Sequence, residues 1–84
     1  MNISRTEQRV LHALAQGGSI RHQRYGDKII VAELITREGF ALGDFNLHVF
    51  ARLRQRGLVE SHGGRPYRIS RAGLGAVRAQ LDNR

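Results

Sequence analysis

Six arginines lie between Arg52 and Leu74, in the stretch RLRQRGLVESHGGRPYRISRAGL, against one acidic residue, Glu60. Guanidinium groups are planar and present fixed donors, so they suit bidentate recognition of phosphate or carboxylate. Three interpretations are open: a solvated basic surface, a nucleic-acid contact, or a docking surface for an acidic partner. A genome rich in G and C would also favour arginine, which supplies every basic residue except Lys28.

Catalysis and metal binding have weaker support. The four histidines, at positions 12, 22, 48 and 62, fall on different expected elements, whereas a zinc site needs three or four converging ligands. The serines are explained as helix caps and turn residues, and none stands at a strand-to-helix elbow. The seven acidic residues are scattered and form no evident acid–base pair. We therefore expect no enzyme, no cofactor and no metal.

The positive charge is concentrated in the second half of the chain. The 84 residues carry a formal net charge of +7; residues 1–42 hold six basic and four acidic residues, and residues 43–84 hold eight and three. We therefore expect an acidic partner to bind the second half of the chain, residues 43–84. The length predicts one domain over residues 1–84. The sequence shows no cysteine, no signal-peptide pattern and no long apolar run, which predicts a cytoplasmic protein without a membrane partner.

The first half predicts a helix followed by a hairpin. Ser4 and Glu7 form a capping-box pattern, and Gly17 ends the helix. The expected core side is Val10, Leu11 and Leu14, and the expected solvent side is Arg5, Arg9, His12 and Gln16. Gly26-Asp27 is a two-residue turn between strands. The expected pairs are Tyr25 with Lys28, His22 with Val31 and Ile20 with Glu33.

A second helix is predicted from the cap Asp44 to Gly57. Its expected core side is Phe45, Val49, Phe50 and Leu53. On its opposite side, at spacings i, i+4 and i+7, a polar face for a groove or a partner is formed by His48, Arg52 and Gln55. Arg54 and Arg56 lie on other sides of this helix, and we expect them to support it.

A second hairpin is predicted around Gly63-Gly64, with Leu58 opposite Ile69 and Glu60 opposite Tyr67. Its arginines and the one that follows it, Arg65, Arg68 and Arg71, are expected to neutralise phosphates. Tyr67 is expected to pack on the sheet rather than stack on a base. Ser70 caps a third helix, whose expected buried stripe is Leu74, Val77 and Leu81.

The fold class predicted from this order is α+β: helix, β-hairpin, helix, β-hairpin, helix. The segment from Asp44 to Ser70 resembles the back half of a winged-helix domain, in which a recognition helix precedes a β-hairpin wing. We therefore expect a small winged-helix-like domain. The pattern departs from that class where a hairpin and the irregular TREGF stand in place of the helix that should precede the recognition helix.

Over its full length the chain also resembles the YjhX-type (TopAI) proteins of bacteria. The resemblance rests on MNISRTEQRVLHALAQGG, TREG, GRPYRI and VRAQLDNR, of which the first and last are the most distinctive. It implies the toxin of a toxin–antitoxin pair, an inhibitor of bacterial DNA topoisomerase I, with an antitoxin partner that is similar to an acetyltransferase. No binding residue is implied by the resemblance.

Three functions follow in order of preference. The first is a non-enzymatic toxin that binds DNA topoisomerase I, with double-stranded DNA as a further contact of the basic half. The second is a winged-helix transcriptional regulator that binds DNA alone, and the third is an RNA- or ribosome-associated basic protein. The expected contact residues in each DNA-binding case are His48, Arg52, Gln55, Arg65, Arg68 and Arg71.

Overall fold

The structure is a computed structural model that describes residues 3–82. Its elements, in chain order, are α1 (Arg5–Ala15), β1 (Ser19–Tyr25), β2 (Lys28–Ile35), α2 (Leu47–Gln55), β3 (Val59–Glu60), β4 (Arg68–Ile69) and α3 (Arg71–Asp82). The α+β class and the predicted order of elements are confirmed. Within the described residues, the segment between α1 and α2 forms a hairpin and a loop but no helix. The likeness to a winged helix therefore stays a prediction.

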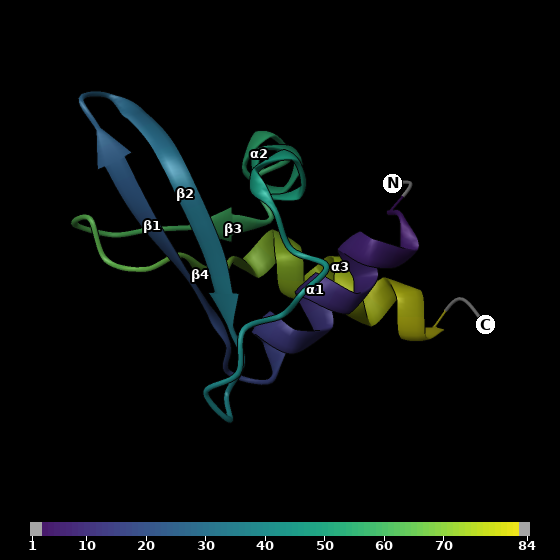
Figure 1. Cartoon of the computed structure of the whole chain (residues 1–84). Helices are drawn as coiled ribbons and strands as arrows, with labels where there is room; N and C mark the ends of the chain where they lie inside the picture. The colour runs from purple at the N-terminus through teal and green to yellow at the C-terminus, as the bar shows by residue number, and fades with distance from the viewer. Residues whose placement is uncertain (1–2, 83–84) are drawn as a thin grey trace.

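Two small antiparallel sheets, β1–β2 and β3–β4, carry the strands. A single bridge joins them, in which Ile20 and Tyr67 each donate a backbone N–H to the other's carbonyl oxygen, both at 2.8 Å. In Figure 1 both hairpins extend to the left of the view, while α1 and α3 lie together to the right. The hairpins and the α1–α3 pair therefore occupy different ends of the molecule.

The core draws on nearly every element. Its buried apolar residues are Val10, Leu11, Leu14, Ile20, Leu34, Phe45, Val49, Phe50, Leu53, Leu58, Val59 and Tyr67. The predicted core sides of the first two helices are thereby confirmed. The Tyr67 ring packs edge-on against Phe50 and His22, with ring centroids 5.0 and 5.1 Å apart. Because this ring is buried, it packs as predicted and offers no face to a base.

The pairing of β1 with β2 matches the prediction only beside the turn. A bulge between Gln23 and Arg24 shifts every inner pair by one residue. This shift puts Leu34 opposite Ile20, both of them fully buried, and moves Glu33 to the exposed side. An unbroken ladder would have placed that carboxylate in the core. The predicted pairs His22–Val31 and Ile20–Glu33 are therefore wrong, and the observed pairs are His22–Ala32 and Ile20–Leu34.

The second hairpin is also shifted by one residue from its predicted register. Val59 pairs with Ile69 and Glu60 with Arg68, instead of Leu58 with Ile69 and Glu60 with Tyr67. The reason is that the backbone of Tyr67 is already paired with β1. The next residue, Arg68, therefore lies opposite Glu60.

The start of α2 corrects the prediction that Asp44 is its cap. The N-cap is Asn46, whose side-chain oxygen accepts the backbone N–H of Val49 at 2.9 Å. Phe45, just before the cap, packs edge-on against Phe50 with centroids 6.1 Å apart. This is a hydrophobic staple, which sets the angle at which the chain enters the helix. The observed N-cap, Asn46, therefore lies two residues after the predicted cap, Asp44.

The third helix begins as predicted but buries a different face. The Ser70 hydroxyl accepts the N–H of Gly73 at 3.0 Å and donates to the carbonyl oxygen of Gly57 at 2.6 Å. Leu74 is 43% exposed, so its predicted burial is wrong. Gly73 is the buried residue of that turn, because the backbone of Leu58 lies directly against it. Val77 is partly buried, and the side chain of Leu81 lies outside the described part of the chain.

Candidate nucleic-acid and partner interface

All six predicted contact residues are exposed. Three of them belong to α2, and we call these the α2 group: His48, Arg52 and Gln55. The other three belong to the second hairpin and the first turn of α3, and we call these the wing group: Arg65, Arg68 and Arg71. Their exposure is what a contact surface requires, and their binding role stays a prediction.

One residue of each group is tied to α1, and the two contacts lie at opposite ends of that helix. Arg52 Nε lies 3.4 Å from the Glu7 carboxylate in the first turn of α1. Arg68 Nη1 donates to the carbonyl oxygen of Gly17, just beyond the end of α1, at 3.3 Å. Ten helical residues span about 15 Å. The structure therefore does not bring the six residues into one cluster, and each group must be considered as a separate surface.

The carboxylate of Glu7 contacts both the start of α1 and two arginines at or near the end of α2. One carboxylate oxygen accepts the backbone N–H of Ser4 at 2.9 Å, while the Ser4 hydroxyl accepts the N–H of Glu7 at 3.1 Å, which completes the predicted capping box. The other oxygen lies 3.4 Å from Arg52 Nε and 3.6 Å from Arg56 Nη1. Burial alone would raise the pKa of Glu7, but the Ser4 hydrogen bonds and the two guanidinium groups outweigh it and lower the pKa. A buried carboxylate is thus kept ionised.

Two of the three residues of the α2 group border a polar hollow of about 270 Å³ between α1 and α2. His48 and Arg52 line it together with two carboxylates, Glu7 and Asp44. Asp44 is itself paired with Arg9 of α1. Because acidic groups lie on both sides, the positive charge of Arg52 is partly balanced within the protein. This hollow is a weaker attractor for phosphate than the arginine count alone suggests.

The wing group has little internal compensation. Neither the Arg65 nor the Arg71 side chain forms a hydrogen bond or ion pair with any other residue that the structure describes, and Arg68 uses one donor on Gly17. The backbone at the tip is nevertheless ordered, since the Arg65 N–H donates to the carbonyl oxygen of His62 at 3.3 Å. Guanidinium groups on a fixed backbone with free donors are suited to bind phosphate oxygens.

The two remaining arginines, Arg54 of α2 and Arg56 at its C-cap, make contacts within the protein. Their predicted role in supporting the helix stays a prediction. The Arg54 guanidinium carbon lies 5.5 Å from the ring centroid of Phe50 and 5.6 Å from that of Tyr67. Arg56 instead reaches Glu7. The sequence pattern did not predict the contacts of Glu7 with Arg52 of α2 and with Arg56 at its C-cap, because these partners are more than forty residues from Glu7. Only the position of Glu7 as the single acid of the first helix hinted at them.

Two further features of the described residues concern metal binding and membrane insertion. Among the described residues, no three histidine or acidic side chains lie close enough together to hold a metal ion. In the same part of the chain, no helix combines the length and apolar composition that crossing a membrane demands.

Comparison with known proteins places the chain in a family. A family model described as "Putative toxin of bacterial toxin-antitoxin pair" matches residues 1–84. A UPF0386 protein of Brucella anthropi is 60% identical over 84 residues, and one of Beijerinckia indica is 56% identical over 85, with both chains of each pair covered in full. No solved structure matches the chain significantly. The chain therefore belongs to the YjhX toxin family of bacterial toxin–antitoxin pairs.

Proposed function

We propose that this protein is a non-enzymatic toxin that binds and inhibits bacterial DNA topoisomerase I, with the wing group in contact with the DNA that the enzyme holds. Membership of a toxin family supports the toxic role and implies an antitoxin partner. The resemblance to the YjhX-type proteins supports the choice of topoisomerase I as target. The observation that carries the mode of action is the wing group, whose Arg65 and Arg71 side chains are exposed and unpaired among the described residues.

A topoisomerase is a suitable target for such a surface because it cleaves and passes DNA strands in a basic groove. A small basic protein can act on the exposed DNA in that complex while another face holds the enzyme. The wing group supplies phosphate contacts, which fix position without reading sequence. The α2 group is secondary in this scheme, because Glu7 and Asp44 offset its charge.

The first test is relaxation of negatively supercoiled plasmid by purified topoisomerase I. We expect the protein to suppress relaxation at near-stoichiometric amounts. The same plasmid with a type II topoisomerase is the control, and its relaxation should continue at the same protein concentration. Undiminished relaxation by topoisomerase I at large excess of the protein would refute the proposed target.

The second test removes two wing arginines. Arg65→Ala combined with Arg71→Ala should weaken binding to duplex DNA and lower the slope of log K against log salt by about two, one for each lost phosphate contact. These two side chains have no partner in the described structure, so folding should be unaffected. Arg78→Ala, which removes an exposed charge from the later part of α3, is the matched control and should leave the slope unchanged.

The transcriptional-regulator alternative predicts different results. It requires one duplex sequence to be bound far more tightly than others, with Arg52→Ala relaxing that preference. The pairing of Arg52 with Glu7 weighs against this alternative. So does the segment between α1 and α2, which forms no helix in the described part of the chain. Sequence-specific retardation of a duplex together with unaffected plasmid relaxation would favour it over the proposed function.

A further inference from the structure

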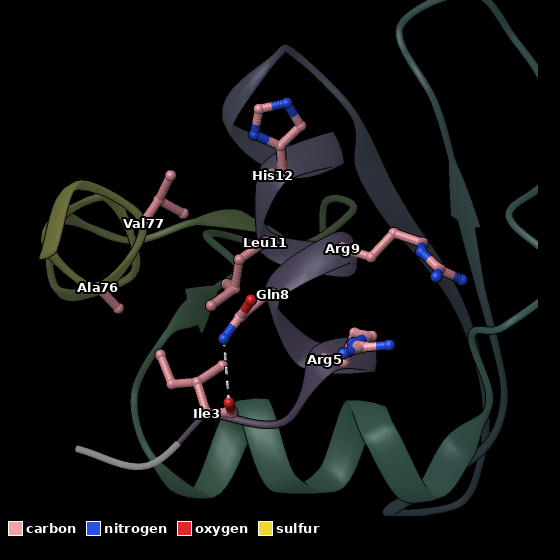
Figure 2. Close-up of a pocket in the computed structure, with 8 residues that line it drawn as sticks. All are labelled: Ile3, Arg5, Gln8, Arg9, Leu11, His12, Ala76 and Val77. Carbon is pink, nitrogen blue, oxygen red and sulfur yellow. Dashed lines mark hydrogen bonds between the residues drawn. The ribbon is translucent and has the colours of Figure 1, made fainter. Parts of the chain in front are cut away.

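A groove between α1 and α3 is separate from both arginine groups. It has a volume of about 310 Å³ and is lined by Ile3, Arg5, Gln8, Arg9, Leu11, His12, Ala76 and Val77. Figure 2 shows Ile3, Gln8 and Leu11 of the α1 side directed toward the α3 helix that carries Ala76 and Val77. The Gln8 side chain is held in place by donating to the carbonyl oxygen of Ile3 at 3.3 Å. The two helices that line this groove, α1 and α3, lie at the end of the molecule away from the hairpins (Figure 1).

The lining combines an apolar floor with a basic rim. Ile3, Leu11, Ala76 and Val77 supply the floor, and Leu74, one turn before Val77 on the same flank of α3, adds an exposed apolar side chain. Arg5 and His12 supply the rim. Arg9 also lines the groove, but its guanidinium group is paired with Asp44, and the lining contains no acidic side chain. Helical spacing alone predicts that this stripe of α1 faces solvent. The groove gives the stripe a different significance, because the stripe borders a hollow that apolar side chains can fill.

We infer that this groove is the docking site for an amphipathic acidic helix of the antitoxin. An apolar side chain of that helix would enter the hollow, and carboxylates beside it would pair with Arg5 and His12, in the manner of helix-in-groove recognition. The inference rests on the family's pairing of toxin with antitoxin and does not depend on topoisomerase I as the target. It also leaves the wing group uncovered.

The charge of the groove favours an acidic partner helix over a second copy of this chain or a nucleic acid. A second copy would bring another chain of net charge +7 against the same basic rim, and like charges disfavour that approach. Nucleic acid would satisfy the rim but would leave the apolar floor unused. An acidic partner with apolar side chains satisfies both parts of the lining.

The decisive variant is Arg5→Glu. Arg5 is the first residue of α1, where a carboxylate favours the helix dipole, so the variant should fold. We expect the Kd for purified antitoxin, measured by calorimetry, to rise about thirtyfold, the size of a hot-spot loss. Arg71→Glu is the matched control, since Arg71 is also the first residue of its helix and the charge change is identical. It should bind the antitoxin within about twofold of the unmodified protein, as expected for a residue outside the interface.

A second variant tests the apolar floor without altering charge. Ala76 is partly buried and lines the groove, so Ala76→Trp places a large side chain there and should weaken the same binding at least tenfold, with circular dichroism confirming the fold. Equal antitoxin affinity in the unmodified, Arg5→Glu and Ala76→Trp proteins would overturn the inference. So would a loss of affinity in Arg71→Glu alone, or a dimer in light scattering that Ala76→Trp dissociates. The plasmid relaxation assay enters none of these outcomes, so this inference and the proposed target fail separately.

Discussion

Alanine at position 73 should destabilise the protein by about 2 kcal/mol, although alanine is the better helix former by about 1 kcal/mol. Gly73 lies in the buried turn of α3, where a Cβ atom would overlap the carbonyl oxygen of Leu58 and lie 2.6 Å from Cγ1 of Ile69. The Leu58 carbonyl cannot retreat freely, because it accepts the backbone N–H of Ser70 at 3.0 Å. Overpacking against fixed backbone therefore outweighs the gain in helix propensity.

Two residues further along, the same substitution should have the opposite sign. Gly75 is exposed, and a Cβ there would meet nothing within 4 Å. Gly75→Ala should therefore stabilise the protein by about 0.5–1 kcal/mol through the reduced entropy of the unfolded chain and the better helix propensity. Both variants change the unfolded chain in the same way, so their difference isolates the contact with Leu58.

Urea unfolding at neutral pH measures both free energies, and thermal melting should separate the two midpoints by roughly 10 °C or more for a chain of this size. If both variants are stabilised equally, α3 does not approach Leu58 as closely as the structure shows. A destabilised Gly75→Ala would mean that the exposed face of α3 is covered in the protein as it exists in solution.

Gly73 also shows where reasoning from sequence reached its limit. The spacing of apolar residues predicted a buried stripe that includes Leu74. Such a pattern is read from apolar side chains, and glycine has none, so the burial of Gly73 could not be predicted in this way. What decides the buried face of α3 is how near its backbone comes to the carbonyl group of Leu58, a tertiary distance that no local pattern encodes. The cap at Ser70 was predictable because it depends only on neighbours in the chain.

The pairing of the strands was likewise predictable near a turn but not farther from it. The turn at Gly26-Asp27 correctly predicted the pair beside it, but the bulge after Gln23 depends on burying Ile20 with Leu34. The shift in the second hairpin depends on the bridge from Tyr67 to the first hairpin. In both cases the local turn chemistry was read correctly, and a contact with another element changed the pairing farther from the turn.

The candidate site was predicted as a list of exposed residues rather than as a place. Helical spacing was enough to put His48, Arg52 and Gln55 on the outer side of α2. Helical spacing could not show that the buried carboxylate of Glu7 lies beside Arg52. It also could not show that Arg68 of the wing group contacts the other end of α1. The groove between α1 and α3 was missed because it arises only where two helices from opposite ends of the chain pack together.

Replacing Glu7 with glutamine should cost about 2 kcal/mol of stability at pH 7, the usual effect of losing hydrogen bonds to a charged group. Glutamine can still complete the capping box, so the change removes mainly the negative charge. Arg52 and Arg56 would then face each other across a neutral buried group. We therefore expect a weaker contact between α1 and α2 and a lower free energy of unfolding, which urea unfolding of the full chain measures.

The pH dependence of this effect has a definite sign. The pKa of Glu7 in the folded protein lies below its ordinary value, which is about 4.3 in an unfolded chain. The ionised carboxylate therefore contributes stability in full above that ordinary value, and the contribution is lost as the pH falls through the lower folded pKa. The stability gap between the unmodified protein and Glu7→Gln should accordingly be widest near neutral pH and should close in acid.

A second carboxylate tests whether this behaviour belongs to Glu7 or to any acidic residue of so basic a protein. Glu60 is 52% exposed and lies 3.4 Å from His62, so Glu60→Gln removes the same charge from the surface and should change the stability by less than about 0.5 kcal/mol at any pH. Equal losses in the two variants would point to the overall charge balance. A loss confined to Glu7→Gln would show that one buried carboxylate, between Ser4 and two arginines, holds the first helix to the second.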